Sequence, residues 1–476
     1  MTLPASSNSW RFTRRERTGL AAALCALIIF GTVLEFRTAL RHAPMTDLGV
    51  FACAAGAVRS GENIYGICDW HGWHYQYPPT LAILFIPLSH PVPAPITILP
   101  TGVLRTDANT PWGYRIDSRS QYYGLHGQNV RFFWIVLAWY IISVGLICFS
   151  AHALACVLDG SKLSQPPASD AGGRRRWWWL RTLPLLICAG SLGTDLSRGQ
   201  VDVLMLAAIA GGLYLINRRR DFAGGICLSF PATVKLFPPF LLLYPFWRRR
   251  WLMSLGVVSG LILALAIIPA IALGPKHTLE LYGNWVDVLA KPALGQGTDT
   301  SRAKELTGMT ATDNQSLLAF IHNWKYLRLP RAERPPEAAQ IERYTVYGIG
   351  TLMLIGTGIA SGIRREDKPQ DLLIIAGILI GLAFVVSPIV HNYYYLELLP
   401  LVTALVNLCL AEETPVKAKL RGVLLIFMLS DMLARLPGIG NHLRDVGVPL
   451  LSMVTMMGAG AWVLLRNDGS SQRRPN

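Results

Sequence analysis

Apolar stretches long enough to cross a lipid bilayer recur along this sequence, from Gly19 almost to the C-terminus. The hydrocarbon core of a bilayer is roughly 30 Å thick and needs about 20 apolar residues in a helix. Composition agrees, because 52% of the 476 residues are hydrophobic, only 15% are charged and the mean hydropathy is +0.36. The sequence therefore predicts an all-α, polytopic transmembrane helical bundle that forms a single membrane-embedded domain over residues 1–476.

Clusters of Lys and Arg between the apolar stretches orient the predicted bundle, because such clusters are enriched on the cytoplasmic side. With every cluster inside, about ten spans connect them and both chain ends are cytoplasmic. The formal net charge of +15 belongs to these clusters, so we expect no nucleic-acid partner. The predicted spans lie near residues 19–40, 130–156, 178–197, 201–217, 252–273, 345–363, 370–390, 393–410, 419–436 and 447–465.

One apolar stretch, residues 222–246, does not fit a simple count of crossings, because an arginine triplet stands at each of its ends. A single crossing would leave one triplet outside. Pro231, Pro238 and Pro239 interrupt the stretch, and proline breaks a helix by removing a backbone donor. The sequence therefore predicts a re-entrant hairpin that enters and leaves on the cytoplasmic side.

Two longer external regions result, residues 41–129 and 274–344. Helical spacing of apolar residues from Leu48 to Gly61 predicts an interfacial helix in the first region, and Pro78-Pro79 predicts the start of a second short helix. The second region carries several basic residues, which the orientation rule tolerates in loops longer than about 60 residues. Cys53 and Cys68 fall in the first region, where a disulfide between them stays open.

Asp47 stands in the first turn of the first interfacial helix, at the expected boundary between lipid and water. The helix dipole there keeps a carboxylate ionised and able to accept a proton. The alternative is that Thr46 and Asp47 only cap the helix. Nearby aromatic residues, Tyr77 among them, belong either to a membrane aromatic belt or to a surface that stacks on sugars.

Charged side chains near the hydrocarbon are costly and therefore mark further candidates. Arg198 either faces a donor phosphate or forms an ion pair with Asp195. Lys235 lies in an apolar stretch, where its insertion costs about 3 kcal/mol, so it faces either an anionic lipid headgroup or free carbonyls at the proline break. His391 either orients a substrate or belongs to the interface belt. We expect no metal and no cofactor, because His71 and His74 lack a matching set of carboxylates.

Several short motifs occur in an order that resembles glycosyltransferase family 87, a family of C-type membrane glycosyltransferases. The similarity covers about residues 15–410. The motifs are Asp47-x-x-x-Phe51, Tyr77-Pro78-Pro79, Gly199-Gln200-Val201-Asp202, Lys235-Leu236-Phe237-Pro238, Asn314-Gln315-Ser316, and Ser387-Pro388 followed by His391-Asn392-Tyr393.

This resemblance implies that Asp47 is the catalytic base and that the donor is a hexose, mannose in the first place, carried on a polyprenyl phosphate. Inversion of a β-linked donor would give an α-glycoside. The family often has Asn at the position of Asp202, which leaves the role of this residue in doubt. The expected substrate-binding residues are Tyr77, Arg198, Gln200, Asp202, Lys235, Asn314, Gln315, His391 and Asn392.

The sequence and the resemblance together predict a hexosyltransferase in the cytoplasmic (inner) membrane, with its active site facing the periplasm or exterior. It would pass a sugar from a polyprenyl-phosphate donor to a lipid or glycan acceptor in an inverting single displacement. A nucleotide sugar is not expected, because there is no cytosolic domain to bind one. A lipid-linked saccharide flippase or transporter is the alternative, although the two related halves common in transporters are not visible.

Overall fold

The computed structural model confirms the predicted all-α bundle. Within the described residues the backbone forms helices and turns without a named strand, and an isolated bridge joins Asn314 to His391. Thr46, Cys68, His71 and several aromatic residues of the first external region lie outside the described residues. The structure describes residues 12–40, 47–66, 74–89, 129–165, 170–235, 240–291, 308–362, 368–411 and 416–471.

Seven helical segments of the described chain are long and apolar enough to cross a membrane. They make the protein a multi-pass membrane protein. They are α1 (Arg14–Glu35), α4 (Asn129–Asp159), α10 with α11 (Trp251–Ile262, Ile268–Leu273), α16 (Gln340–Ser361), α17 (Pro369–Val386), the 3-10 turn η8 with α18 (Asn392–Leu398, Leu399–Leu410), and α21 (Val448–Ser471).

The three other predicted spans are also helical but shorter. The predicted span 178–197 is divided at Cys188 into two helices. These shorter helices are α5 (Ala171–Ile187), α6 (Ala189–Arg198), α7 (Asp202–Asn217) and α19 (Lys417–Leu433).

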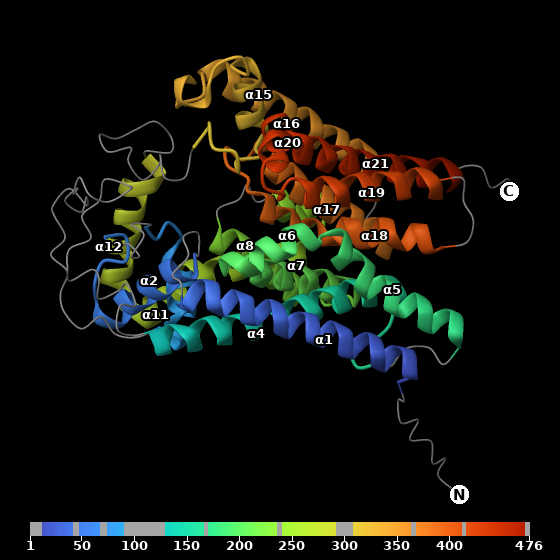
Figure 1. Cartoon of the computed structure of the whole chain (residues 1–476), viewed down its shortest axis with the longest axis horizontal. Coiled ribbons are helices and arrows are strands. Elements are labelled where there is room, and N and C mark those ends of the chain that lie inside the picture. Colours follow the sequence, from blue (N-terminus) through green and yellow to red (C-terminus); the bar gives the residue numbers. More distant parts are fainter. Residues whose placement is uncertain are drawn as a thin grey trace, which may run out of the picture.

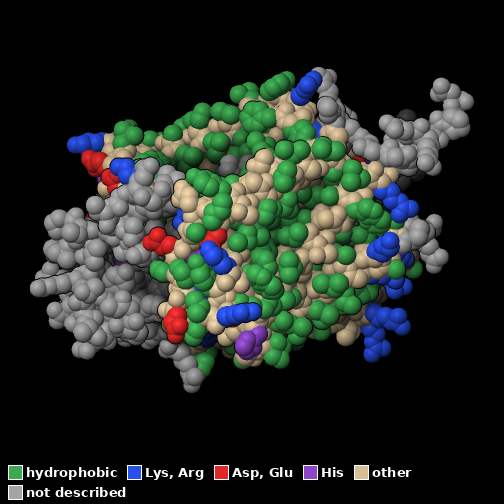
Figure 2. Space-filling view, turned by 90° about the horizontal axis from the view of Figure 1, so that it is seen from above, with side chains coloured by type: hydrophobic (Ala, Val, Ile, Leu, Met, Phe, Trp, Pro, Cys, Tyr) green, Lys and Arg blue, Asp and Glu red, His purple; other side chains and the backbone are tan. Residues whose placement is uncertain are grey.

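The helices run side by side along one axis of the molecule (Figure 1). The start of α1 and the end of α21 lie at one end, whereas α2 (Leu48–Ser60), α11 and α12 (Pro275–Trp285) lie at the other. Figure 2 shows an apolar face across the middle of the molecule, with Lys and Arg at both ends of it; those on the left are interspersed with Asp and Glu. Helix α17 is central, because 83% of its most apolar window is buried against 17% for α1.

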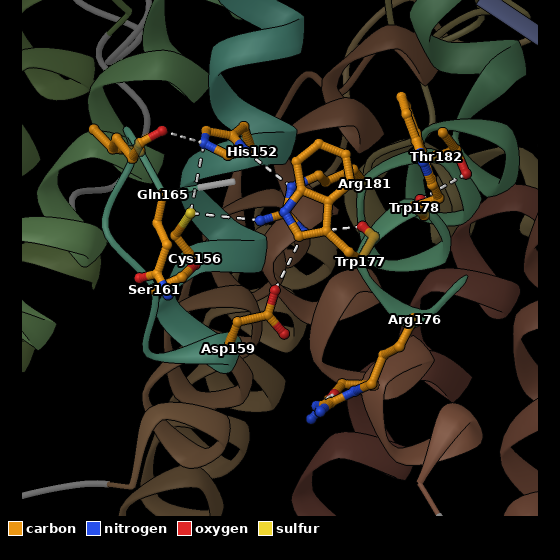
Figure 3. A network of polar contacts seen from close by, with 12 residues as sticks. His152, Cys156, Asp159, Ser161, Gln165, Arg176, Trp177, Trp178, Arg181 and Thr182 are labelled. Atoms are coloured by element: carbon orange, nitrogen blue, oxygen red, sulfur yellow. Dashed lines mark hydrogen bonds and ion pairs between the residues drawn. The ribbon is translucent and has the colours of Figure 1, made fainter. Parts of the chain in front are cut away.

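A polar network joins α4 to α5 at the end where α1 begins (Figure 3). Arg181 donates to His152 Nδ1 at 2.9 Å and to Asp159 Oδ2 at 3.2 Å, and its guanidinium lies 3.9 Å from the centre of the Trp177 ring. A buried charge is tolerated only when it is paired in this way. Arg181 therefore fixes these two helices to each other.

Residues 222–246, predicted to be a re-entrant hairpin, turn back on themselves as a hairpin requires. Helix α8 (Asp221–Val234) ends at Lys235, and the chain resumes in a 3-10 turn (Phe240–Leu242) and α9 (Leu243–Trp247). Arg250, just after α9, donates to Asp221 Oδ2 at 2.9 Å at the start of α8. The two ends of the segment therefore lie close together, and Lys235 stands directly after α8, at the end of that helix far from Asp221.

The close approach of α8 to α10 depends on glycine. A Cβ atom at Gly225 would collide with the backbone of α10 at Met253, and one at Gly256 would collide with the backbone of α8 at Phe222. Small residues at such crossings let two helix backbones pack in direct contact within a membrane. This packing holds the tip of the hairpin in a fixed position.

Helix α2 begins after Asp47 and ends at Gly61, which has the left-handed φ of +71° that a helix end of this kind requires. Helix α3 (Pro79–Leu84) begins at the predicted Pro79. Helix α2 is covered by other parts of the protein over most of its surface. Its residues from Leu48 to Val50 and most of those up to Ala57 are buried, because α3 and other elements cover more than one face.

The second external region contains α12, α15 (Leu317–Lys325) and a 3-10 turn, η7 (Arg331–Glu333). Helix α15 packs against α16 and against α20 (Ile439–Asp445), which precedes α21. These three helices lie together in the upper part of Figure 1. The segment just before α15, residues 308–316, leads from them toward the candidate site.

Candidate functional site

Asp47 precedes α2, and its side chain forms no cap hydrogen bond with the helix backbone. The carboxylate instead accepts hydrogen bonds from Arg198 Nε at 3.2 Å and from the amide of Gln200. Its backbone N–H donates to the carbonyl of Arg198 at 2.8 Å, which fixes α2 to the end of α6. The side chain is 16% exposed, so this oriented carboxylate remains accessible to a small polar group.

Arg198 is the last residue of α6, and Gly199 follows it with a left-handed φ of +65° that turns the chain toward α7. Its guanidinium pairs with Asp47 and lies 3.9 Å from Asp313 Oδ2. It also lies 5.2 Å from the centre of the Tyr393 ring. The alternative pair between Asp195 and Arg198 is not formed, because the turn directs Arg198 toward α2 instead.

Gln200 links Asp47 to Lys235. Its amide nitrogen donates to Asp47 and, at 3.1 Å, to the hydroxyl of Tyr393, while its oxygen accepts from Lys235 Nζ at 3.2 Å. Lys235 also donates to Asp202 Oδ1 at 2.6 Å, and both side chains of this ion pair are almost completely buried. Asp202 and Gln200 thus hold the ammonium, rather than the backbone carbonyls considered from the sequence.

Tyrosine rings surround these polar groups. Lys235 Nζ lies 4.4 Å from the centre of the Tyr394 ring and 5.2 Å from that of Tyr393. Tyr77 packs edge-on against Phe51 of α2. Burial, and then the nearby carboxylates of Asp47 and Asp202, raise the pKa of the Tyr77 phenol, so it stays neutral. The predicted residue Tyr77 therefore lies at the site.

Asp313 is a member of the site that the sequence analysis missed. Its carboxylate lies 3.3 Å from His391 Nδ1 and 3.9 Å from Arg198 Nη1. Burial alone would raise the pKa of Asp313, but the His391 hydrogen bond and the charges of His391 and Arg198 outweigh burial and hold it below its ordinary value. The available signal was its place directly before the Asn314-Gln315-Ser316 motif.

His391 joins the site through Asp313 and stacks on Tyr393, with ring centres 5.2 Å apart and planes 10° apart. Asn314 and Gln315 hold this region together without touching Asp47. Asn314 donates to Pro388 O and accepts from Val390 N, and Gln315 N donates to Val390 O at 2.6 Å.

The backbone carbonyl of Asn392 accepts a hydrogen bond from the hydroxyl of Ser191 at 2.9 Å. The backbone N–H of Ser191 donates to Asp431 Oδ2 at 2.8 Å, and Asp431 pairs with Arg435. This contact ties η8 to α6 and α19. The side chains of Asn314, Gln315 and Asn392 are therefore not brought to Asp47 by any described contact.

Two further buried carboxyl groups, Asp195 and Glu397, lie close enough to Asp202 and Lys235 to interact with their charges. They are 0% and 3% exposed. An acidic residue within an apolar helix is the sequence signal for such a site, and Glu397 went unused in the sequence analysis. The described residues contain no group of three His, Cys, Asp or Glu side chains placed to hold a metal ion.

These groups form one connected polar cluster at the junction of α2, α6, α7, α8 and η8. A partly exposed carboxylate, held by two donors, is suited to accept a proton from a hydroxyl group. Arg198, and behind it Lys235, supply positive charge in a setting shielded from water, where it strongly stabilises a developing anion. The cluster can therefore activate a hydroxyl and stabilise an anionic leaving group.

Comparison with known proteins gives one assignment. A family model described as glycosyltransferase family 87 matches residues 75–388, which is more than half of the chain. The matched range includes Tyr77, Arg198, Lys235 and Asp313, whereas Asp47 precedes it and His391 follows it. No curated protein and no solved structure matches the chain significantly. The family match agrees with the ordered motifs and with the membrane bundle, and the chain belongs to glycosyltransferase family 87.

Proposed function

We propose that this membrane glycosyltransferase transfers a hexose, with mannose as the expected sugar, from a polyprenyl-phosphate donor to a lipid or glycan acceptor. The reaction is a single displacement with inversion at the anomeric carbon. Asp47 takes the proton of the acceptor hydroxyl, the oxygen forms a bond to the anomeric carbon, and the bond from that carbon to the phosphate oxygen breaks. The lipid phosphate leaves with the bonding electron pair.

The observation that carries this proposal is the environment of Asp47. A helix cap would direct the carboxylate into the backbone of α2, but its partners are Arg198 and Gln200. Both partners donate to the carboxylate, so together they fix its direction. A general base must be held within reach of the proton that it abstracts, and this orientation provides that.

Positive charge for the leaving phosphate comes from Arg198 and Lys235. Arg198 is the cation in direct contact with Asp47, so it is the nearer group for the departing phosphate. Lys235 is already paired with Asp202, and its contact with Gln200 also positions the side chain that holds Asp47. Lys235 therefore acts both through its charge and through Gln200.

The proposed location is the cytoplasmic membrane, with the site on the periplasmic or exterior side. This orientation rests on the basic clusters at the starts of α1, α5 and α19, which lie at the end of the bundle opposite α2 (Figure 1). The two external regions, residues 41–129 and 274–344, would then flank the site. A polyprenyl-phosphate donor would reach it from within the membrane.

The test is a transfer assay with purified full-length protein and polyprenyl-phosphate hexose, with mannose and glucose donors in parallel. Wild-type protein should release polyprenyl phosphate. Asp47→Asn keeps an oxygen that can accept from Arg198 and Gln200 but cannot take up a proton at neutral pH. It should lower turnover by about 10² to 10⁴ while donor binding survives.

Asp287→Asn is the matched control, because Asp287 is exposed and pairs only with neighbouring Lys291 among the described contacts. It should leave turnover unchanged. An Asp47→Asn protein that retains more than about a tenth of wild-type turnover would remove Asp47 as the base. A wild-type protein that moves the donor across the membrane and leaves it chemically intact would favour the flippase instead.

A further inference from the structure

Two buried carboxyl groups behind Lys235 take no part in the proposed displacement. Asp195 belongs to α6 and Glu397 to η8, and both are almost completely buried in the middle of the bundle, where α6, α7 and α8 lie together (Figure 1). Neither group forms an ion pair among the described residues, since the ammonium of Lys235 is held by Asp202 at 2.6 Å. The other cation of the cluster, Arg198, pairs with the proposed base. An ionised carboxylate without a partner is very costly to bury, and such a group takes up a proton instead.

Both groups face the carboxylate of Asp202. The side chains of Asp195 and Glu397 each lie within hydrogen-bonding reach of it. Repulsion by Asp202 also acts on each group more strongly than attraction by Lys235 does. Ionised carboxylates form no hydrogen bond with one another, and in that state Asp202 Oδ2, both oxygens of Asp195 and Glu397 Oε1 have no partner among the described residues. A protonated carboxyl group is a donor, so one proton on each group turns two repulsive contacts into hydrogen bonds.

Buried water is a weaker explanation for the unpaired oxygens. Glu397 borders a narrow cavity of about 40 Å³ between α7, the hairpin and α17. This space has room for roughly three water molecules. The other side chains that line it are apolar, among them Met205, Leu228 and Phe384, whereas a buried water needs two to four polar partners. Asp195 does not line this cavity, so water there would leave its oxygens unpaired as well.

We propose that Asp195 and Glu397 are held as neutral carboxylic acids and act as positioning residues, each donating a hydrogen bond to Asp202. Hydrogen bonds to an ionised group are short and strong, so two of them would fix the direction of the Asp202 carboxylate. They would also draw negative charge away from its contact with Lys235. The ammonium would then keep more of its positive field for an anion on the side of Gln200, which it also contacts.

The neutral state matters because the proposed reaction forms an anionic phosphate beside this cluster. If Asp195 and Glu397 were both ionised, the ammonium of Lys235 would face three carboxylates, with an excess of two negative charges. Charges interact strongly in a buried setting, so this excess would repel the departing phosphate. With both protons in place, the pair of Lys235 and Asp202 is neutral. The protons stay on the two acids throughout, and neither acid exchanges a proton with the substrate.

Infrared spectroscopy tests the protonation state without any substrate. A protonated carboxyl group has a carbonyl stretching band that carboxylates lack, so the difference between the spectra of wild type and a variant identifies the form that was removed. Asp195→Asn and Glu397→Gln, measured on the full-length protein in detergent at neutral pH, should each remove an acid band. Loss of a carboxylate band in either variant overturns the proposal.

Glu342→Gln is the matched control for the infrared measurement. Glu342 is also buried, at 4% exposed, but it accepts a hydrogen bond from Lys325 Nζ at 3.1 Å. A buried carboxylate with a cation beside it has no need of a proton. The control should therefore remove a carboxylate band and no acid band.

Turnover tests the positioning role, which rests on the proposed function. The amide of Glu397→Gln can still donate to Asp202, so this variant should keep turnover within about threefold of wild type. Glu397→Met has no donor and should lose about tenfold or more, since a hydrogen bond to a charged group is removed. Equal turnover in the Gln and Met variants overturns the positioning role.

The double variant Asp195→Asn with Glu397→Gln keeps both donors and decides the question if the Met variant does not fold. It should remain active, and loss of its turnover would mean that the acids are needed in ionised form, which overturns the proposal. The infrared result is independent of transfer. An active Asp47→Asn protein would refute the proposed base and leave the acid bands unchanged, so the two failures are distinguishable.

Discussion

At the scale of single residues, the buried ion pair between Lys235 and Asp202 affects the stability of the protein and, in the proposed mechanism, its activity. Their ion pair is 2.6 Å long, and the two side chains are 4% and 0% exposed. Removal of one partner from such a pair typically costs about 3 to 5 kcal/mol, because the other charge is left buried without compensation. A loss of activity in a single variant would therefore not by itself reveal the role of Lys235.

A double substitution separates the two roles of Lys235. Lys235→Met should lower both stability and turnover, whereas Lys235→Arg should retain part of the turnover because the positive charge remains. The double variant Lys235→Met with Asp202→Asn removes both charges and should recover most of the lost melting temperature. If the charge serves the donor phosphate, turnover stays low in this stable protein.

Thermal unfolding and donor turnover, measured on the same preparations, check this prediction. Turnover that returns together with the melting temperature would assign Lys235 a structural role only. Lys235 contacts Gln200, which in turn contacts Asp47, so a substitution at Lys235 can also displace Asp47. Donor affinity should therefore be measured together with turnover.

At the scale of helices, the position of the hairpin tip depends on how closely α8 and α10 pack. Gly225 and Gly256 stand where each helix backbone touches the other. A methyl group at either position has no space to enter, and the neighbouring atoms are backbone atoms that cannot rotate away. The two helices would have to separate, and Lys235 would move with α8.

Gly225→Ala should therefore lower the melting temperature, by the equivalent of about 1 to 3 kcal/mol, and reduce turnover. Gly145→Ala in α4 is the matched control, because a Cβ atom there has no neighbour within 4 Å. Since alanine is the better helix former, the control should be as stable as wild type or slightly more stable. Equal melting temperatures for the two variants would contradict tight packing at Gly225.

At the scale of the whole molecule, the proposed orientation makes a labelling prediction. A membrane-impermeant maleimide applied from outside intact spheroplasts should modify a cysteine introduced at Glu280 in α12. A cysteine introduced at Gly172, at the start of α5, should react only after the membrane is permeabilised. Both positions are exposed at opposite ends of the bundle, so access to them depends on the membrane alone.

The background protein for this measurement should have its native cysteines replaced. The reverse pattern would place Asp47 at the cytoplasmic surface and would reject the proposed external acceptor. Labelling of both positions from outside would indicate leaky membranes and is checked with a cytoplasmic marker protein.

The sequence by itself determined the membrane bundle, the hairpin at residues 222–246 and the helix boundaries at Asp47, Gly61 and Pro79. These features depend on local chemistry: the length of apolar stretches, the position of basic clusters, and the backbone limits of proline and glycine. The ordered motifs also identified the family. Arg198 and Lys235 could be named as candidates because charged side chains near hydrocarbon are costly to retain, whereas Gln200, and the catalytic role of Asp47, followed from the resemblance.

Only the tertiary structure decided which of these side chains meet. Asp47 and Arg198 are separated by about 150 residues of sequence, and nothing local to either residue favours their ion pair over a helix cap at Asp47 or a pair between Arg198 and Asp195. The packing of α2 against the end of α6 made that choice. Long-range contacts determine how segment 308–316 packs against η8. This packing directs the side chain of Asp313 toward Arg198 and His391, whereas the side chains of Asn314 and Gln315 point elsewhere.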